Sequence, residues 1–458
     1  MAYRLKSQII RTIRGNSGSS AVFLALAFLA FAICITGGIG ISRKLAVMSE
    51  CQAYGRVWTK AVLSEYDRHL LEDYKLMAYW GNEIEVDRKI DDYLDYSAAD
   101  RLNVRLGATE SDLAGYELGE PYNFRMALEQ GFASSAAESI LSGQGRKPRN
   151  GKLIGDEDHT DSSDASGVSG SNNSGRIIGN TVVLDTLPSG GARSSFSTDS
   201  FVERAKSAGS EEGVRSAASS AGIEMWFMWQ YFNSCVTTAD NKPHYLSNEL
   251  EYVVKGSPDD TVNYEACRKR IFIMRNVLNL AALYKDPAKV ELIEAAAQLI
   301  TPGPLGAATQ LILAEAWAAA ETEKDLDILY DNGRVPVMKR SDQWHTAFES
   351  VIRSSEVRKK LDDESRQLLD ENSEEIHSLP GIGNAAEVLT EGLSYDDHLL
   401  LLILCVNKNT RLLRVMDIVQ INMKYRYYRD FNLMEYYTGV RFALTADGRN
   451  YVFEDSYK

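Results

Sequence analysis

Residues 21–44 read AVFLALAFLAFAICITGGIGISRK, and no charged side chain occurs between Ala21 and Ile41. A helix rises about 1.5 Å per residue, so about 20 such residues cross the hydrocarbon core of a bilayer. A cleaved secretory signal has a shorter apolar core of about 7–15 residues. The stretch therefore predicts a transmembrane helix over residues 19–42 that anchors the chain in a lipid bilayer. We assign the lipid-facing role to Ala21, Val22, Phe23, Leu24, Leu26, Phe28, Leu29, Phe31, Ile33, Ile35, Ile39 and Ile41.

The residues on either side of this stretch bear on its orientation. The basic residues before it are Arg4, Lys6, Arg11 and Arg14, and those after it are Arg43, Lys44, Arg56 and Lys60. Because these counts are balanced, and because long domains translocate largely regardless of charge, the positive-inside rule does not decide the orientation. A short basic head is easily retained, so we expect residues 1–18 to be a cytoplasmic leader. The bulk of a single-pass chain would then lie outside the cell membrane.

The chain is expected to remain helical beyond the membrane. Residues 45–80 contain no proline and one glycine, Gly55, and their apolar residues recur at helical spacing. One continuous helix from the lipid to Trp80 is the most economical prediction. Two interpretations of this helix remain open: a simple stalk behind an anchor, or an assembly helix of the pilin kind, half embedded and half packed on a globular head. The acidic residues within it, Glu65, Asp67, Glu72 and Asp73, are interpreted as a solvated helix face.

Composition divides the rest of the chain. Residues 43–142 are predicted to form a helical extracytoplasmic region, with an amphipathic helix over Tyr122–Leu141. Residues 143–200 are rich in serine, glycine and aspartate and cannot bury enough apolar surface to offset their ordering entropy, which predicts a flexible insert. A strand or short hairpin is expected over residues 176–187. Residues 201–458 are predicted to be a helical extracytoplasmic domain.

Within that domain, helices are predicted over Glu249–Val254, Cys267–Tyr284 and Lys289–Ile300. A second uncharged stretch, Ala295–Ala314, contains Pro302 and Pro304, which favour two buried helices over a second membrane span. Apolar helices over Leu399–Val406 and Thr410–Met423 are too short to cross a bilayer and are expected in the core. The alternating C-terminal tail with its Asp447–Gly448 turn predicts a β-hairpin. The predicted fold class is mainly α with a small β component (α+β).

The charge of the chain limits its partners. Its 458 residues carry a net charge of −14, which argues against nucleic-acid binding because phosphate neutralisation needs a basic surface. One segment, KYRYYRDF at residues 424–431, alternates aromatic and basic residues as stacking platforms do. On such an acidic chain we expect it to join a helix to the terminal hairpin, with its aromatic rings packed inward.

The five cysteines form no CxxC pair, and one of them, Cys34, lies inside the apolar stretch. The other four have irregular spacings, so free, buried thiols are favoured over two disulfides, which remain the alternative. These four are Cys51, Cys235, Cys267 and Cys405.

The sequence lacks the short motifs that carry known chemistry. It contains no GxxxxGK[ST] loop, no GxGxxG after a strand, no HExxH and no GxSxG. Four aspartates in the insert, at 156, 158, 161 and 164, lack the glycine and the closing glutamate of a calcium loop. We therefore expect a non-enzyme with no catalytic residue, cofactor, metal or small-molecule substrate. The histidines, none at ligand spacing with another, are His69, His159, His244, His345, His377 and His398.

The segment SGSSAVFLALAFLAF, residues 17–31, resembles the N-terminus of TadE/TadG-like proteins, the pseudopilins of tight-adherence pilus systems. More specifically, the chain resembles an uncharacterised family of membrane proteins from Gram-positive, clostridia-like bacteria. That resemblance rests on segments such as AVLSEYDRHLLEDYKLMAY (61–79), CRKRIFIMRNVLNLAALYKDP (267–287) and SYDDHLLLLIL (394–404). It implies a structural or accessory subunit of a type IV pilus-related assembly or secretion system, with other membrane proteins of that system as partners.

The resemblance also supplies a test of processing. A prepilin peptidase cuts after glycine and leaves glutamate at mature position five. The candidate cleavage positions here are Gly15 and Gly18, which would place Ser20 or Phe23 at that position. Neither is acidic, so cleavage and incorporation into a filament remain open. The alternative function is a membrane-tethered extracellular binding module, an adhesin or a cell-wall receptor.

Overall fold

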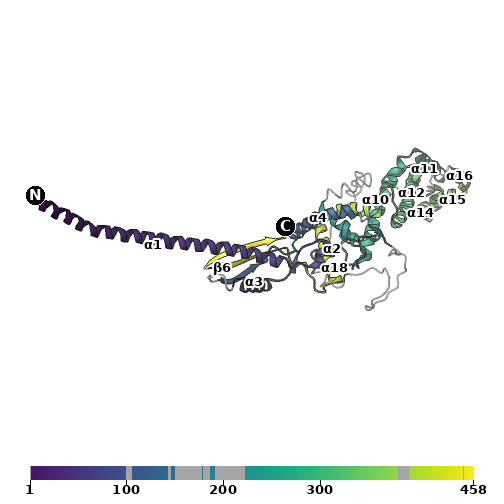
Figure 1. Ribbon diagram of the computed structural model, residues 1–458. Helices are drawn as coiled ribbons and strands as arrows, with labels where there is room; N and C mark the ends of the chain where they lie inside the picture. Colours follow the sequence, from purple (N-terminus) through teal and green to yellow (C-terminus); the bar gives the residue numbers. More distant parts are fainter. Residues whose placement is uncertain are drawn as a thin grey trace. The chain divides into compact units, whose positions relative to one another are not determined.

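A computed structural model describes residues 2–98, 106–142, 146–149, 178, 186–190, 222–379, 391–446 and 448–457 (Figure 1). The chain forms two compact units, each built from segments that are distant in the sequence. Unit 1 comprises Met1–Tyr66, Ala78–Glu117 and Tyr437–Lys458. Unit 2 comprises Asp67–Met77 and Leu118–Tyr436. The predicted fold class is confirmed, since helices dominate and the strands form small sheets.

The long N-terminal helix, α1, spans Ala2–Leu63 and belongs to unit 1 (Figure 1). The prediction that it continues to Trp80 is wrong. The carboxylate of Asp67 accepts the backbone N–H of Leu70 at 2.8 Å and thereby starts a separate short helix, α2, over Arg68–Tyr74. Such a capping bond satisfies a backbone donor that a helix end leaves unpaired, so an aspartate without any proline is enough to begin a new helix. Trp80 lies in strand β1, Tyr79–Trp80.

The C-terminal hairpin is confirmed and belongs to unit 1. Strands β6, Gly439–Ala446, and β7, Arg449–Ser456, pair antiparallel with Phe442 opposite Phe453. A third strand that the sequence did not predict, β2 over Leu106–Asp112, pairs antiparallel with the other edge of β6. The result is a three-stranded sheet in the order β2-β6-β7.

The second half of α1 packs on this sheet (Figure 1). Its buried side chains include Val47, Cys51, Trp58 and Val62, and their separations of four, seven and four residues, about one or two helical turns, place them on one helix face. The strands contribute the buried rings of Phe442 and Phe453 to the same core. At Gly55 a Cβ atom would overlap the ring of Phe453, so the closest approach of helix to strand requires glycine.

Helix α3, Glu83–Ala98, completes unit 1 and covers β2. Its carboxylates bind the edge of that strand: Asp87 accepts the backbone N–H of Ser111 at 2.6 Å, and Asp91 accepts the hydroxyl of Thr109 at 2.6 Å. These bonds satisfy donors that an edge strand would otherwise expose.

Unit 2 is predominantly helical. Besides α2 its elements are α4 (Pro121–Ser142), β3 (Lys147–Pro148), α8 (Ile223–Tyr231), β4 (Thr237–Thr238), α9 (Glu249–Lys255), α10 (Asp260–Tyr284), α11 (Pro287–Ile300), α12 (Gly306–Tyr330), η1 (Ser341–Gln343), α13 (Phe348–Ile352), α14 (Ser355–Lys360), α15 (Asp363–Glu371), α16 (Ser373–His377), α17 (Tyr395–Leu404), α18 (Lys408–Arg426) and η2 (Leu433–Glu435). The two-residue strand β5, Tyr436–Tyr437, lies where the chain passes from unit 2 to unit 1.

These elements confirm the helices predicted from the sequence. The uncharged stretch 295–314 forms the end of α11 and the start of α12, separated at residues 301–305, as the two prolines predict. Around it lies a core that contains the paired rings of Trp317, Trp344 and Phe348. Helices α17 and α18 are also core, and Leu399–Ile403 are all buried.

The predicted flexible insert, residues 143–200, falls mostly outside the described residues. Strand β3 of the insert pairs with β4, which lies outside the insert. Ile178 of the insert is buried and donates its backbone N–H to the carbonyl of Pro258 at 2.8 Å. None of the five cysteines, all of which the structure describes, forms a disulfide, and three of them, Cys51, Cys235 and Cys267, are buried. The prediction of free thiols is thus confirmed, with Cys405 only partly covered.

Candidate functional site

A long, continuous exposed apolar surface lies on α1. Every residue from Ala21 to Ala46 is exposed, including all twelve that the sequence assigned to the lipid-facing role. Within the described residues this is the one helix long and apolar enough to cross a membrane. Soluble proteins rarely expose so long an apolar surface without a partner that covers it. The anchor residues therefore stand where a lipid bilayer can cover them.

The side chains of α1 change from exposed to partly buried just after the two basic residues Arg43 and Lys44. Arg43 and Lys44 are exposed, and Val47 is the first residue of the helix that the core of unit 1 covers. The helix thus has an uncovered apolar half and a half that packs on a sheet. The two candidate cleavage positions, Gly15 and Gly18, lie within α1, and no contact of either is described.

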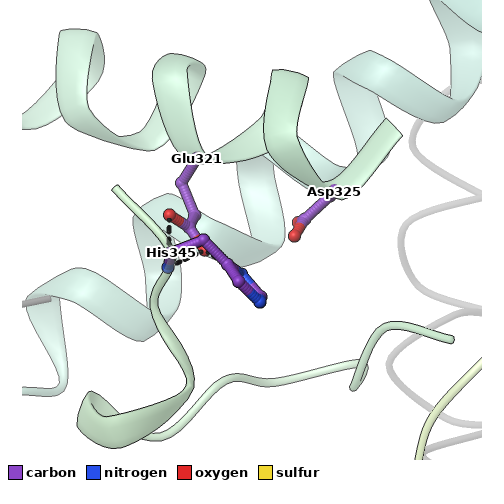
Figure 2. A group of neighbouring side chains, drawn as sticks. All are labelled: Glu321, Asp325 and His345. Carbon is purple, nitrogen blue, oxygen red and sulfur yellow. Dashed lines mark hydrogen bonds and ion pairs between the residues drawn. The ribbon is translucent and has the colours of Figure 1, made fainter. Parts of the chain in front are cut away.

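A second candidate is a group of three side chains in unit 2 (Figure 2). Glu321 and Asp325 stand one turn apart on α12, and His345 follows η1 in the next connection. One ligand atom from each lies within 4.8 Å of the other two. Carboxylates at i and i+4 with an imidazole nearby are a donor set that suits a divalent cation. The spacing ETEKD at residues 321–325 was the available sequence signal, but the position of His345 depends on the fold.

Protein cations already neutralise this group. The ammonium of Lys339 contacts the carboxylates of both Glu321 and Asp325. The guanidinium of Arg275 donates to Asp325 at 2.9 and 3.0 Å. All four side chains are fully buried. A metal ion would have to displace Lys339, so the contacts favour a structural ion network over a metal centre.

Hydrogen bonds hold Glu321 in its charged form. Burial alone would raise the pKa of this carboxyl, but the hydrogen bond with His345 and the charge of Lys339 outweigh burial and lower the pKa to about 2. Thr346 adds its backbone N–H at 2.8 Å and its hydroxyl at 2.6 Å. The cluster therefore connects α12 to the segment around residues 339–346, which the sequence alone does not pair.

One acidic residue of the segment 65–73 differs from its predicted role, whereas Glu65 and Glu72 are exposed as expected. Asp73 is buried rather than solvated, and it accepts hydrogen bonds from Arg426 at 2.7 Å and from Lys242 at 2.5 Å. Burial opposes the charge of Asp73, but these two cations keep its pKa below the ordinary value. Arg426, one of the three basic residues of KYRYYRDF, thus forms an ion pair that the sequence pattern did not indicate.

The aromatic rings of KYRYYRDF also differ from their prediction. Phe431 is buried, but Tyr425, Tyr427 and Tyr428 are each between 38% and 43% exposed. They stay outside because the buried helix face of α18 ends at Met423, and the chain turns after Arg426.

The remaining histidines have separate environments. The ring of His244 lies between Asp240 at 2.9 Å and Glu249 at 2.8 Å, and His377 faces Glu349 on the surface. Burial would lower the pKa of His244, but the charge of Glu249 and the hydrogen bond to Asp240 raise it to about 9. His69 stacks on Tyr427, and His398 is fully buried. His159 lies outside the described residues.

Fold and site together define a class: a mainly helical protein of two units, one of which carries a helix able to cross a membrane. Comparison with protein families identifies the family to which the chain belongs. The model of a family of unknown function (DUF5702) matches residues 171–448, more than half of the chain, so the protein belongs to this family. This membership confirms the expectation of an uncharacterised family. The matched residues exclude the apolar part of α1. Searches of curated proteins and of solved structures each found no match.

Proposed function

We propose that this protein is a membrane-anchored, non-catalytic subunit of a tight-adherence, type IV pilus-related assembly or secretion system, comparable to TadE/TadG-like pseudopilins. The observation that supports the proposal is the division of α1. One continuous helix leaves residues 21–46 exposed and buries Val47, Cys51, Trp58 and Val62 against an antiparallel sheet.

That division has a mechanical consequence. A helix held in the membrane and also packed into a folded unit has no flexible joint between the two parts, so a force on the anchor reaches the sheet directly. A simple tether needs no such continuity. The arrangement therefore supports a subunit that assembles with others in the membrane, rather than a head on a loose stalk.

The proposed orientation places the N-terminus in the cytoplasm and both units outside. Protease treatment of intact cells tests it with tags at each end. We expect the tag after Lys458 to be removed and the tag before Met1 to survive until the membrane is opened. The opposite pattern, or release of the intact chain as a soluble protein, would overturn the proposed anchor and its topology. The same N-terminal tag shows whether a peptidase cuts after Gly15 or Gly18.

The role in assembly needs its own experiment. Deletion of the gene should abolish a surface filament or a secretion phenotype, and cross-linking in cells should join the chain to polytopic membrane proteins of that system. If deletion leaves every such phenotype intact while the anchor and topology are verified, the assembly role is wrong. A membrane-tethered binding module would then be the better explanation, since it needs the same anchor but no assembly partners.

A further inference from the structure

We propose that Lys339 and Asp325 of unit 2 join through a side-chain amide bond, an intramolecular cross-link that forms without another protein, with Glu321 as the carrier of protons. The inference does not depend on the proposed assembly role, because all three side chains lie in the interior of unit 2. It rests on the contact of one ammonium with two carboxylates, on the exclusion of water and on the donors that bind one oxygen of Asp325.

The reacting atoms are already in contact. Nζ of Lys339 touches Oδ1 of Asp325 and Oε1 of Glu321. Both carboxylates extend from α12 toward the segment that carries His345 (Figure 2). Apart from the contact with Lys339, Oδ1 of Asp325 has no hydrogen-bond partner among the described residues. Groups held in this way react as parts of one molecule, at an effective concentration far above any concentration in solution.

Water is excluded from this contact. The side chains of Lys339, Asp325 and Glu321 are all 0% exposed. In water an ammonium and a carboxylate persist as ions because both are well hydrated. Burial removes that hydration and so favours the neutral amine and the neutral acid, which are the forms that condense. The absence of bulk water also suppresses the hydrolysis that would reverse the reaction.

The other oxygen of Asp325 already has the donors that the reaction requires. Oδ2 accepts hydrogen bonds from Nε and Nη2 of Arg275 at 3.0 and 2.9 Å and from Nδ2 of Asn279 at 2.8 Å. Attack of a nitrogen on the carboxyl carbon places negative charge on this oxygen, and fixed donors stabilise that charge as an oxyanion hole does. Oδ2 therefore becomes the carbonyl oxygen of the amide, and Oδ1 is the oxygen that leaves.

Glu321 is held as the proton carrier rather than as the group that is attacked. Its oxygens accept the backbone N–H groups of His345 and Thr346 at 3.0 and 2.8 Å and the hydroxyl of Thr346 at 2.6 Å. These bonds favour the charged carboxylate, which resists attack by an amine but can accept a proton. An oxygen of Glu321 lies within 4.8 Å of an oxygen of Asp325. The same carboxylate can thus serve both the nitrogen and the leaving oxygen.

The reaction balances as a condensation. The ammonium of Lys339 passes one proton to Oδ1 of Asp325, and the resulting amine attacks the carboxyl carbon, which forms the C–N bond. Glu321 takes a second proton from the nitrogen and delivers it to Oδ1. The C–Oδ1 bond then breaks and one water molecule leaves, so that an ammonium and a carboxylate become an amide and water. Nothing is oxidised or reduced, and no co-reactant is needed.

The test is mass spectrometry of the full-length chain, purified in detergent micelles, denatured and digested with trypsin. We expect the wild type to yield residues 325–334 (DLDILYDNGR) joined to residues 335–340 (VPVMKR), lighter than the two separate peptides by one water molecule. Trypsin does not cut after an acylated lysine, so Lys339 stays uncleaved in this product. The joined peptide is decisive, because Asp447 before Gly448 can also lose water by cyclisation and lower the mass of the intact chain.

Two variants and an internal control define the chemistry. Lys339→Arg keeps the positive charge but cannot form the amide, so it should release residues 325–334 as a free peptide. Glu321→Gln keeps the shape of the side chain but cannot carry the protons, and it should lower the joined fraction at least tenfold. Lys289 is the matched control. Its buried Nζ lies 2.8 Å from Asp286, and no second carboxylate of the described residues pairs with it, so trypsin should cut after Lys289.

The wild-type digest decides the proposal whether or not the variants fold. A wild-type chain that releases residues 325–334 as a free peptide contains an ion pair only, and this result would overturn the proposal. A product that joins residues 290–324 to residues 335–340 would overturn the assignment of Asp325, because Glu321 lies in the first of these peptides. A folded Glu321→Gln chain that is joined as fully as the wild type would overturn the role of Glu321 as proton carrier.

Discussion

At the scale of single residues, the interior of unit 2 depends on buried charges that compensate one another. Lys339 lies between Glu321 and Asp325, and all three side chains are fully buried. Replacement of this lysine by methionine keeps the length of the side chain but leaves two carboxylates with one cation, Arg275. An uncompensated buried charge costs about 3–5 kcal/mol. We expect Lys339→Met to lower the free energy of unfolding of unit 2 by about that amount in urea titrations followed by tryptophan fluorescence.

The control is a lysine in an exposed ion pair. Lys324 reaches Asp327 at 3.2 Å with both side chains more than half exposed. Exposed pairs contribute about 1 kcal/mol or less, so Lys324→Met should change stability by no more than that. Equal losses for the two variants would contradict the importance assigned to the buried network.

His398 is expected to make the free energy of unfolding depend on pH. Its Nδ1–H donates to the carbonyl of Ser394 at 2.6 Å, and its buried Nε2 has no hydrogen-bond partner among the described residues. Burial, with a smaller contribution from the charge of Arg275, lowers the pKa of His398 to about 4. Between that value and about 6.5 the unfolded chain binds a proton that the folded chain does not bind. Stability is therefore lost as pH falls through this range.

The test compares unfolding at pH 7 and pH 4.5 in the wild type and in His398→Leu. The wild type should lose about 2 kcal/mol more than the variant on acidification, because the variant has no imidazole to protonate. Leucine also changes the packing at both pH values. The diagnostic quantity is therefore the difference between the two proteins in how much free energy of unfolding they lose from pH 7 to pH 4.5. Identical losses of free energy of unfolding in the two proteins would show that His398 is not a neutral, buried imidazole.

At the scale of elements, the end of α9 is fixed by one glycine. Gly256 has φ of +71°, and a Cβ atom there would overlap the guanidinium of Arg414. That arginine donates to the carbonyls of Val253 and Val254 at 2.9 and 3.0 Å, so it satisfies acceptors at the end of the helix. We expect Gly256→Ala to lower the melting temperature measurably, with a loss of about 2 kcal/mol from backbone strain and displacement of Arg414.

A second glycine provides the comparison for that variant. Gly81 has no positive φ, and a Cβ atom there would make only ordinary contacts at 3.8–3.9 Å. Gly81→Ala should therefore change stability by less than about 1 kcal/mol. Similar melting temperatures for the two alanine variants would contradict the role given to the left-handed conformation at Gly256.

At the scale of the whole molecule, the proposed membrane anchor and the core of unit 1 use different parts of the same helix, α1. Residues 21–46 contribute no buried side chain, whereas Val47 and the residues after it build the core of unit 1. We expect a chain that begins at residue 45 to stay in solution without detergent and to retain the unfolding transitions of the full-length protein. Differential scanning calorimetry and sedimentation of membranes check this expectation.

A shorter fragment, compared with the one that begins at residue 45, tests whether α1 belongs to the core of unit 1. A fragment that begins at residue 64 lacks Val47, Cys51, Trp58 and Val62, and with them the helix side of the unit 1 core. Its unit 1 transition should disappear because the sheet then exposes Phe442 and Phe453 to water. If both fragments show the same transitions, α1 is not part of that core.

By itself the sequence determined the features that depend on local composition and periodicity. The absence of charge over Ala21–Ile41 is enough to predict a helix that can cross a membrane, since length and hydropathy decide this. Helices such as α10 and α11, and the hairpin of β6 and β7, follow from spacing, prolines and a turn. These signals lie within a few residues of the structure they predict.

Only the tertiary structure decided how distant segments meet. Strand β2 joins β6 across more than three hundred residues, and Lys339 reaches two carboxylates of α12; neither contact leaves a local pattern. The end of α1 at Leu63 needed the bond from Asp67 to Leu70, which competes with a helical pattern that contains no proline. Burial of Asp73 and exposure of Tyr427 likewise follow from which surfaces the fold brings together. Such pairings depend on the shape of the whole unit, because each charge or ring is stabilised by a partner that the fold supplies.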